Sequence, residues 1–112
     1  MGYLGEFEQL ILFSVVKLGD HAYGGAIREA IERRTGRVVS SGAINTALGR
    51  LAERKFVATR VGAPTAGRAG RPRKYYAITP DGARALKASY AIIRAMAGGL
   101  TAKLDRLAGD ES

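Results

Sequence analysis

The stretch SSGAINTALGRL, residues 40–51, has the pattern of a short helix with one apolar stripe and one small, polar face. Ser40 and Ser41 offer hydroxyl oxygens that can cap the N–H groups of a first helical turn. The apolar stripe consists of Ile44, Leu48 and Leu51. With that stripe turned inward, the remaining side chains face outward: Gly42, Asn45, Thr46, Gly49 and Arg50. The stretch therefore predicts a helix that packs on one side and presents a small, polar surface on the other.

That outward surface is suited to a DNA major groove, although an ordinary solvated face is the alternative. Small residues allow close approach of the backbone, Asn45 and Thr46 can hydrogen-bond base edges or phosphates, and Arg50 can reach a phosphate or a guanine. Gly49 favours the first interpretation, because a glycine inside a helix costs about 1 kcal/mol relative to alanine and calls for a packing or contact reason.

Two more helices are predicted before this stretch. Residues 6–18 are apolar around the whole helical circumference, which indicates a buried helix. After Gly19-Asp20-His21, apolar residues recur at helical spacing as far as Thr35, and Gly36 supplies a left-handed C-cap. Residues 37–39 form a short extended segment. Three short helices joined by tight turns predict a helix-turn-helix core.

After the third helix the pattern changes to two strands. Residues 56–61 and 74–78 are rich in β-branched and aromatic side chains, and a stretch rich in Gly, Pro and Ala, residues 62–72, separates them. This pattern predicts a β-hairpin with a long tip. The expected fold class is therefore mainly α with a small β-hairpin: a winged helix-turn-helix domain over residues 1–80, followed by a long C-terminal dimerisation helix.

The C-terminal helix is expected over residues 81–108, with a disordered tail at 109–112. Thr79-Pro80 places a cap residue before a proline at the first helical position. Since the preceding elements close their own core, we expect the apolar stripe of this helix to pack against a second copy, with a kink at Gly98-Gly99. The stripe follows spacings of four and three: Leu86, Tyr90, Ile93, Ala97, Leu100, Leu104 and Leu107.

Positive charge is concentrated around the hairpin. The chain has a net charge of +8, and residues 50–74 hold eight basic residues against one acid, Glu53. Four of the basic residues lie on the hairpin loop and at its end, where glycines and prolines contribute no core: Arg68, Arg71, Arg73 and Lys74. A basic tip beside a helix with an outward polar face is suited to lying along phosphates or entering a narrow minor groove.

Other function classes lack support in the sequence. The absence of cysteine removes disulfides, thiolate metal sites and thiol nucleophiles, and suits a cytoplasmic protein. His21 is the single histidine and has no partner at a metal-ligand spacing, and neither a phosphate-binding loop nor a catalytic triad is present. No apolar run approaches the ~20 residues of a membrane span. We therefore expect no enzymatic activity, no metal, no cofactor and no membrane partner.

These features together resemble the PadR family of bacterial transcriptional regulators over about residues 4–86. The similarity rests on Leu10-Ile11-Leu12 followed by Tyr23-Gly24, on Ser41-Gly42-Ala43-Ile44 with Leu48, Arg50 and Leu51, and on Gly70-Arg71-Pro72-Arg73-Lys74-Tyr75-Tyr76 leading to Thr79-Pro80 and Gly82. The resemblance implies a DNA-binding homodimer, usually a repressor. It places the third helix in the major groove, the wing in the flanking groove and the C-terminal helix in the dimer contact, as in the compact family members with one such helix.

The residues expected to contact DNA, from both lines of reasoning, are Tyr23, Ser40, Ser41, Gly42, Asn45, Thr46, Arg50, Arg68, Arg71, Arg73 and Lys74. Three residues depart from the family pattern. Asn45 stands in place of a common tyrosine, so no operator sequence can be transferred from relatives. Ala52 replaces a frequent acid. Lys55 replaces a usual glycine, which makes a left-handed C-cap less favourable there.

Two other partners remain open at this stage, because basic charge alone does not distinguish them from double-stranded DNA. One is RNA or a ribonucleoprotein, and the other is an acidic protein that meets the basic wing. The identity of a small-molecule effector cannot be read from the sequence, since Phe7, Ile11, Tyr90 and Met96 could line a pocket or simply pack.

Overall fold

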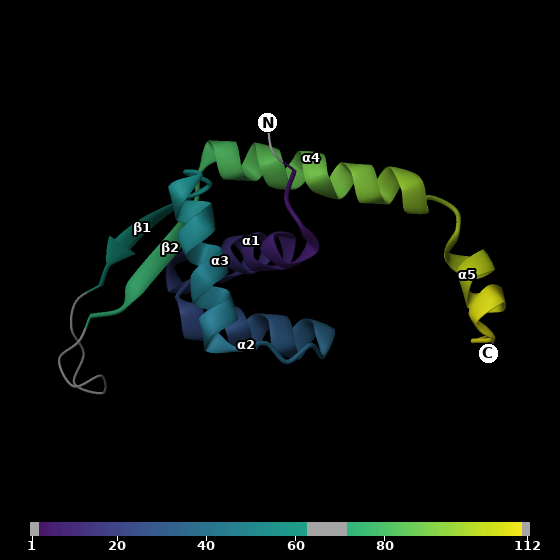
Figure 1. Cartoon of the computed structure of the whole chain (residues 1–112), viewed down its shortest axis with the longest axis horizontal. Coiled ribbons are helices and arrows are strands. Elements are labelled where there is room, and N and C mark those ends of the chain that lie inside the picture. The colour runs from purple at the N-terminus through teal and green to yellow at the C-terminus, as the bar shows by residue number, and fades with distance from the viewer. Residues whose placement is uncertain (1–2, 63–71, 111–112) are drawn as a thin grey trace.

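The computed structural model describes residues 3–62 and 72–110, and in this part of the chain a two-stranded hairpin packs against a group of helices (Figure 1). The hairpin projects at one end, and the C-terminal helix lies at the other. This is the expected winged helix-turn-helix fold, mainly α. Its elements in order are α1 Glu6–Leu18, the 3-10 turn η1 Gly19–His21, α2 Gly24–Thr35, α3 Ser41–Glu53, β1 Val57–Val61, β2 Lys74–Ile78, α4 Pro80–Ala97 and α5 Thr101–Ala108.

The core forms around α1, as its apolar sequence predicts. Ile11, Leu12 and Val15 are buried, and α1 contacts α2, α3, α4 and β2. The predicted stripe of α3 faces the same core, because Ile44, Leu48 and Leu51 are all buried. Apolar burial on this scale dominates the folding free energy of a small domain, and here it fixes which face of α3 remains outside.

Both ends of α3 are held by specific backbone geometry. The Ser40 hydroxyl accepts a hydrogen bond of 3.0 Å from the Ala43 N–H, which confirms the predicted N-cap. After the helix, Lys55 adopts a left-handed φ of 63°, and the Phe56 N–H donates to the Leu51 carbonyl at 2.9 Å. The left-handed turn is therefore retained at a residue other than glycine.

The hairpin pairs β1 with β2 in antiparallel register, from Val57 opposite Ile78 to Val61 opposite Lys74. Its second strand is joined to the turn before α2, where Tyr23 forms a β-bridge with Tyr75 and the Tyr76 N–H donates to the Ala22 carbonyl at 2.8 Å. The expected extended segment at residues 37–39 forms no strand. The turn before α2 occupies the free edge of β2 instead, which leaves residues 37–39 without a strand to pair with.

The C-terminal helix expected over residues 81–108 is divided in two. Gly98 has ψ 124° and Gly99 has a left-handed φ of 77°, so the helical hydrogen bonding stops where the sequence predicted a kink. Helix α5 has no buried residue, and Gly109 ends it with a left-handed φ of 78°. Leu86, expected in the dimer stripe, is instead buried in the core of the protomer, because the first half of α4 packs on α1.

Candidate nucleic-acid interface

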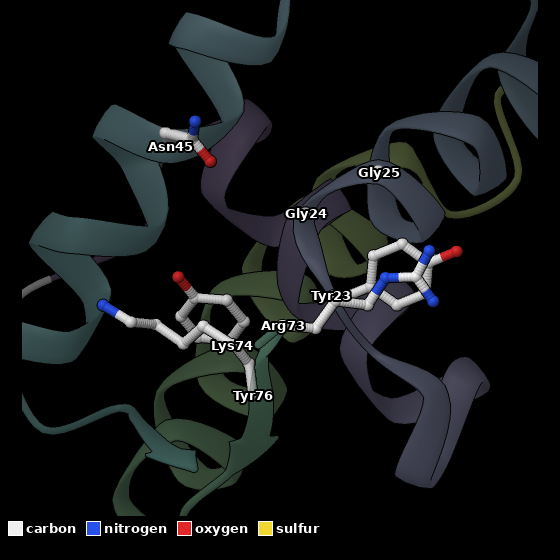
Figure 2. A pocket seen from close by; sticks show the side chains of 7 residues that line it. All are labelled: Tyr23, Gly24, Gly25, Asn45, Arg73, Lys74 and Tyr76. Carbon is white, nitrogen blue, oxygen red and sulfur yellow. The ribbon is translucent and has the colours of Figure 1, made fainter. Parts of the chain in front are cut away.

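A pocket of about 260 Å³ lies where α2, α3 and the hairpin meet (Figure 2). Its lining comes from the start of α2, from one side chain of α3 and from the beginning of β2. The lining residues are Tyr23, Gly24, Gly25, Asn45, Arg73, Lys74 and Tyr76. Four of these residues are among the expected DNA contacts, and the structure brings them together from separate parts of the chain: Tyr23, Asn45, Arg73 and Lys74.

The N-terminus of α2 contributes positive electrostatic potential to the pocket. Tyr23 is the N-cap residue, and its side chain accepts no capping hydrogen bond from the first turn. The first N–H groups of a helix have no partner within the helix and carry the positive end of its dipole. Gly24 and Gly25 line the pocket and have no side chains that could cover these groups. Such a helix terminus is suited to an anion.

Two cations at the start of β2 add to this potential: Arg73, directly before the strand, and Lys74, its first residue. The Arg73 guanidinium carbon lies 4.0 Å from the centre of the Tyr23 ring. Its Nε atom is buried and has no hydrogen-bond partner in the described part of the chain. Lys74 is exposed beside it. The pocket therefore combines a helix N-terminus with two cationic side chains.

Tyr76 supplies a neutral donor to the same pocket. Burial raises the pKa of the Tyr76 phenol above its ordinary value, since desolvation disfavours the phenolate. The hydroxyl therefore stays protonated at neutral pH and can donate to an anion. The sequence analysis missed Tyr76, Gly24 and Gly25 as lining residues, although the motif Tyr23-Gly24 at a predicted helix start was a usable signal for the glycines.

Asn45 connects the pocket to the exposed face of α3. Its Oδ1 atom lies 3.3 Å from the position that a Cβ at Gly24 would occupy. Figure 2 shows Asn45 projecting from α3 on the side of the pocket. The rest of the predicted outward face is exposed as expected: Gly42, Thr46, Gly49 and Arg50. A Cβ at Gly42 or Gly49 would meet no atom of the described protein within 4 Å, so packing within the protomer does not require either glycine.

The remaining residues predicted to contact DNA lie at the start of α3 or outside the described part of the chain. Ser40 is exposed but its hydroxyl oxygen caps α3, and Ser41 is exposed in the first turn. Arg68 and Arg71 lie outside the described residues. The predicted face thus extends along α3 from Ser41 to Arg50, with Arg73 and Lys74 beside its pocket.

A second surface, formed by α4 and α5, is apolar. Most of the predicted stripe is exposed, including Ile93 at 59% and Leu104 at 57%. Tyr90 is partly covered by an edge-to-face contact with Phe13, whose ring centre is 5.4 Å away. Tyr3, Ile92 and Met96 extend this surface, and the heptad pattern did not include them. The two helices therefore expose more large apolar side chains than isolated surface residues would account for.

Residues 3–62 and 72–110 hold neither a metal-binding cluster nor a membrane-spanning helix. No cluster of three or more His, Cys, Asp or Glu side chains there could hold a metal ion. Within the same ranges, no helix has the length and hydropathy needed to cross a membrane.

A sequence profile described as "Transcriptional regulator PadR-like family" matches residues 12–88. A comparison with curated protein sequences finds no significant match.

Solved structures share the fold. A PadR family transcription regulator from Clostridium difficile is 23% identical, with a TM-score of 0.73 over 89% of this chain and 99% of that one. A transcriptional regulator from Clostridium thermocellum is 25% identical, with a TM-score of 0.68 over 80% and 81%. Bacillus subtilis PadR in complex with operator DNA is 20% identical, with a TM-score of 0.63 over 73% of this chain and 46% of that one.

Proposed function

The chain belongs to the PadR-like family of transcriptional regulators, and from this membership we propose that it binds double-stranded DNA with sequence preference, as a homodimer that represses transcription. In this proposal the chain acts in the cytoplasm and performs no catalysis. The observation that carries the proposal is the common surface formed by the start of α2, the exposed face of α3, and the cations Arg73 and Lys74 at the start of β2.

The pocket on this surface is suited to one phosphate of the DNA backbone. The first N–H groups of α2 and the cations Arg73 and Lys74 favour an anion, and Asn45 and Tyr76 supply neutral donors. A phosphate contact of this kind fixes the register of the protein on the duplex without reading sequence. The pocket thus sets how α3 approaches the groove.

The exposed face of α3 then supplies the sequence preference. The small residues Gly42 and Gly49 allow the helix backbone close to the base edges, and Thr46 and Arg50 offer donors to them. Asn45 lies between this face and the phosphate pocket, so it can serve either contact. That the related Bacillus subtilis PadR was solved with operator DNA supports this use of the fold.

Dimerisation is proposed for the apolar surface of α4 and α5. Exposed side chains such as Ile93 and Leu104 would otherwise remain in water, and a two-fold contact would cover the same face on both copies. Two copies would present two α3 helices to half-sites about one or two helical turns apart, which is the geometry of a palindromic operator. Repression follows where such an operator overlaps a promoter.

The test is a titration of the full chain with selected genomic fragments, random DNA and RNA duplexes of the same sequence. We expect a DNA fragment enriched from the genome to bind at least about a thousandfold more tightly than random DNA at physiological salt. RNA of that sequence should bind no better than random DNA. Equal affinity for the RNA and DNA duplexes, or no binding of random DNA at low salt, would contradict the proposal.

A reporter assay then tests repression. Placing the enriched fragment over a promoter should lower expression when the chain is present, and Thr46→Ala should restore it. Unchanged or raised expression would contradict the repressor role while leaving DNA binding intact.

A further inference from the structure

Two arginines and the two tyrosines between them form a continuous series of contacts that runs from the hairpin to the pocket. The Arg60 guanidinium carbon lies 4.4 Å from the centre of the Tyr75 ring. Tyr75 contacts Tyr23 edge to face, with ring centres 5.8 Å apart and an interplanar angle of 80°. Arg73 covers the Tyr23 ring at 4.0 Å. We call this series, Arg60, Tyr75, Tyr23 and Arg73, the Arg–Tyr stack.

We propose that the Arg–Tyr stack holds Arg73 in place for its phosphate, so that Arg60 and Tyr75 are positioning residues that strengthen DNA binding without touching DNA. The inference rests on the proposed function and deepens it. It assigns a role to Arg60, which the sequence marks only as part of the basic stretch at residues 50–74.

The far end of the stack is anchored to the protein body. The Nη2 atom of Arg60 donates a hydrogen bond of 3.0 Å to the Asp20 carbonyl, in the turn between α1 and α2. One arginine thus binds a backbone carbonyl and covers an aromatic ring at the same time. Because both interactions use its planar guanidinium, a lysine at this position could not reproduce them together.

Tyr75 is fixed between its neighbours. Its backbone is held by the β-bridge to Tyr23. On another side Gly62 lies so close that a Cβ there would be 2.6 Å from Cε2 of the Tyr75 ring. The ring therefore has little freedom to leave Tyr23, and Tyr23 in turn is a fixed surface for Arg73.

This restraint matters because a free arginine loses much side-chain entropy when it binds. Arg73 has already lost part of that freedom in the unbound protein, where its guanidinium lies on the Tyr23 ring and its Nε atom is buried. The pocket is therefore preorganised for an anion before DNA arrives. Loss of the stack should weaken the phosphate contact even though no charge at the pocket changes.

A double-mutant cycle on a random-sequence duplex tests the inference in the full chain. Arg73→Ala should weaken binding about tenfold and lower the salt slope by about 0.9, the value for one phosphate contact. Tyr75→Leu should weaken binding about fivefold while all charges are kept. In the Arg73→Ala background, Tyr75→Leu should change affinity by less than twofold. Tyr75→Phe, which keeps the ring, should restore wild-type binding.

Two further variants distinguish the positioning role of Arg60 from a simple effect of its charge. Arg60→Lys keeps the charge and should still weaken binding severalfold. Arg84→Ala removes one exposed arginine of α4, which is not part of the stack, and should have a smaller effect. In the free protein, NMR relaxation of the Arg73 Nε–H group should report an ordered side chain that becomes mobile on Tyr75→Leu.

The inference is overturned if Tyr75→Leu weakens binding as strongly with Arg73→Ala as without it, or if Arg73 remains equally ordered in the Tyr75→Leu protein. An Arg60→Lys protein that binds like wild type would also overturn it. Failure of the proposed function would be seen separately, because the wild-type chain itself would then not bind DNA.

Discussion

Gly82 lies so close to Phe56 that a Cβ at position 82 would be 2.1 Å from the Phe56 carbonyl oxygen and 2.9 Å from its carbonyl carbon. The same turn is fixed by Thr79, whose N–H donates to that oxygen at 3.0 Å and whose hydroxyl donates to the Lys55 carbonyl at 2.7 Å. The start of α4 is thereby seated on the loop that follows α3. Since the obstructing atoms are backbone, they cannot move aside as a side chain would.

Gly82→Ala should therefore lower the free energy of unfolding by about 3 kcal/mol, at the upper end of the usual cost of overpacking. Urea unfolding followed by circular dichroism measures it. Gly42→Ala is the matched control, because a Cβ at position 42 meets nothing within 4 Å. Equal stability of the two variants would show that α4 is not seated on the Phe56 backbone.

Lys55 should be a site where glycine stabilises the protein. Its φ of 63° is left-handed, a conformation that costs a side-chain-bearing residue about 1–2 kcal/mol. Part of this gain is offset by the greater freedom of glycine in the unfolded chain, so Lys55→Gly should stabilise by about 1 kcal/mol. Lys55→Ala removes the same charge but keeps the strain, and should leave stability nearly unchanged. A Lys55→Gly protein no more stable than the Lys55→Ala protein would contradict this explanation.

Elements set by local periodicity were predictable from the sequence. The first helix has the predicted bounds Glu6–Leu18, and the buried stripe and exposed face of α3 follow its spacing of apolar residues. The bridge between Tyr23 and Tyr75 was not predictable in this way, because it joins segments far apart in sequence through packing. That bridge builds the pocket and explains why residues 37–39 form no strand.

In the C-terminal region, too, tertiary packing could not be predicted from the spacing of apolar residues. A heptad spacing cannot distinguish a stripe that packs within the protomer from one that faces a partner, so Leu86 was grouped with residues such as Leu104. The glycines at 98 and 99 did signal a weak point. Whether they bend the helix or end it depends on backbone angles that composition does not specify.

Gly49 offers a test of close approach to DNA. Because its Cβ would meet no atom of the described residues within 4 Å, Gly49→Ala should stabilise α3 by about 0.5–1 kcal/mol, the difference in helix propensity. The same methyl group should weaken binding to the preferred DNA site severalfold if the backbone of α3 lies against the groove. Thermal unfolding and fluorescence anisotropy measure the two effects. A variant that is more stable and binds equally well would contradict close approach at Gly49.

Substitutions in the phosphate pocket and on the exposed face of α3 should have different effects on DNA binding. Lys74→Ala should weaken binding to preferred and random DNA by similar factors. It should also reduce the slope of log affinity against log salt concentration by about 0.9. Thr46→Ala should cost about 1–3 kcal/mol on the preferred site and leave random DNA nearly unaffected. A salt-series titration of both variants on both DNAs distinguishes them. Our assignment of roles would be wrong if Lys74→Ala reduced only specific binding.

The apolar face of α4 and α5 should control the oligomeric state, and the break at Gly98 and Gly99 allows its two halves to be tested separately. Ile93→Asp changes α4, and Leu104→Asp changes α5; both side chains are exposed, so neither change removes a core contact within the protomer. Buried in a dimer contact, each new carboxylate would be desolvated without a partner. We expect each variant to shift the chain from a dimer towards the 11.9 kDa monomer in light scattering at micromolar concentration.

Lys87→Asp, an exposed change of charge on α4 outside the apolar stripe, is the control and should remain dimeric. Unfolding supplies a second measurement, since the stability of a dimer rises with protein concentration and that of a monomer does not. If only Ile93→Asp dissociates the dimer, α4 alone forms the contact and the exposed stripe of α5 serves another purpose. A wild-type chain with monomer mass and concentration-independent unfolding would contradict dimerisation altogether, and with it the expectation of a palindromic operator.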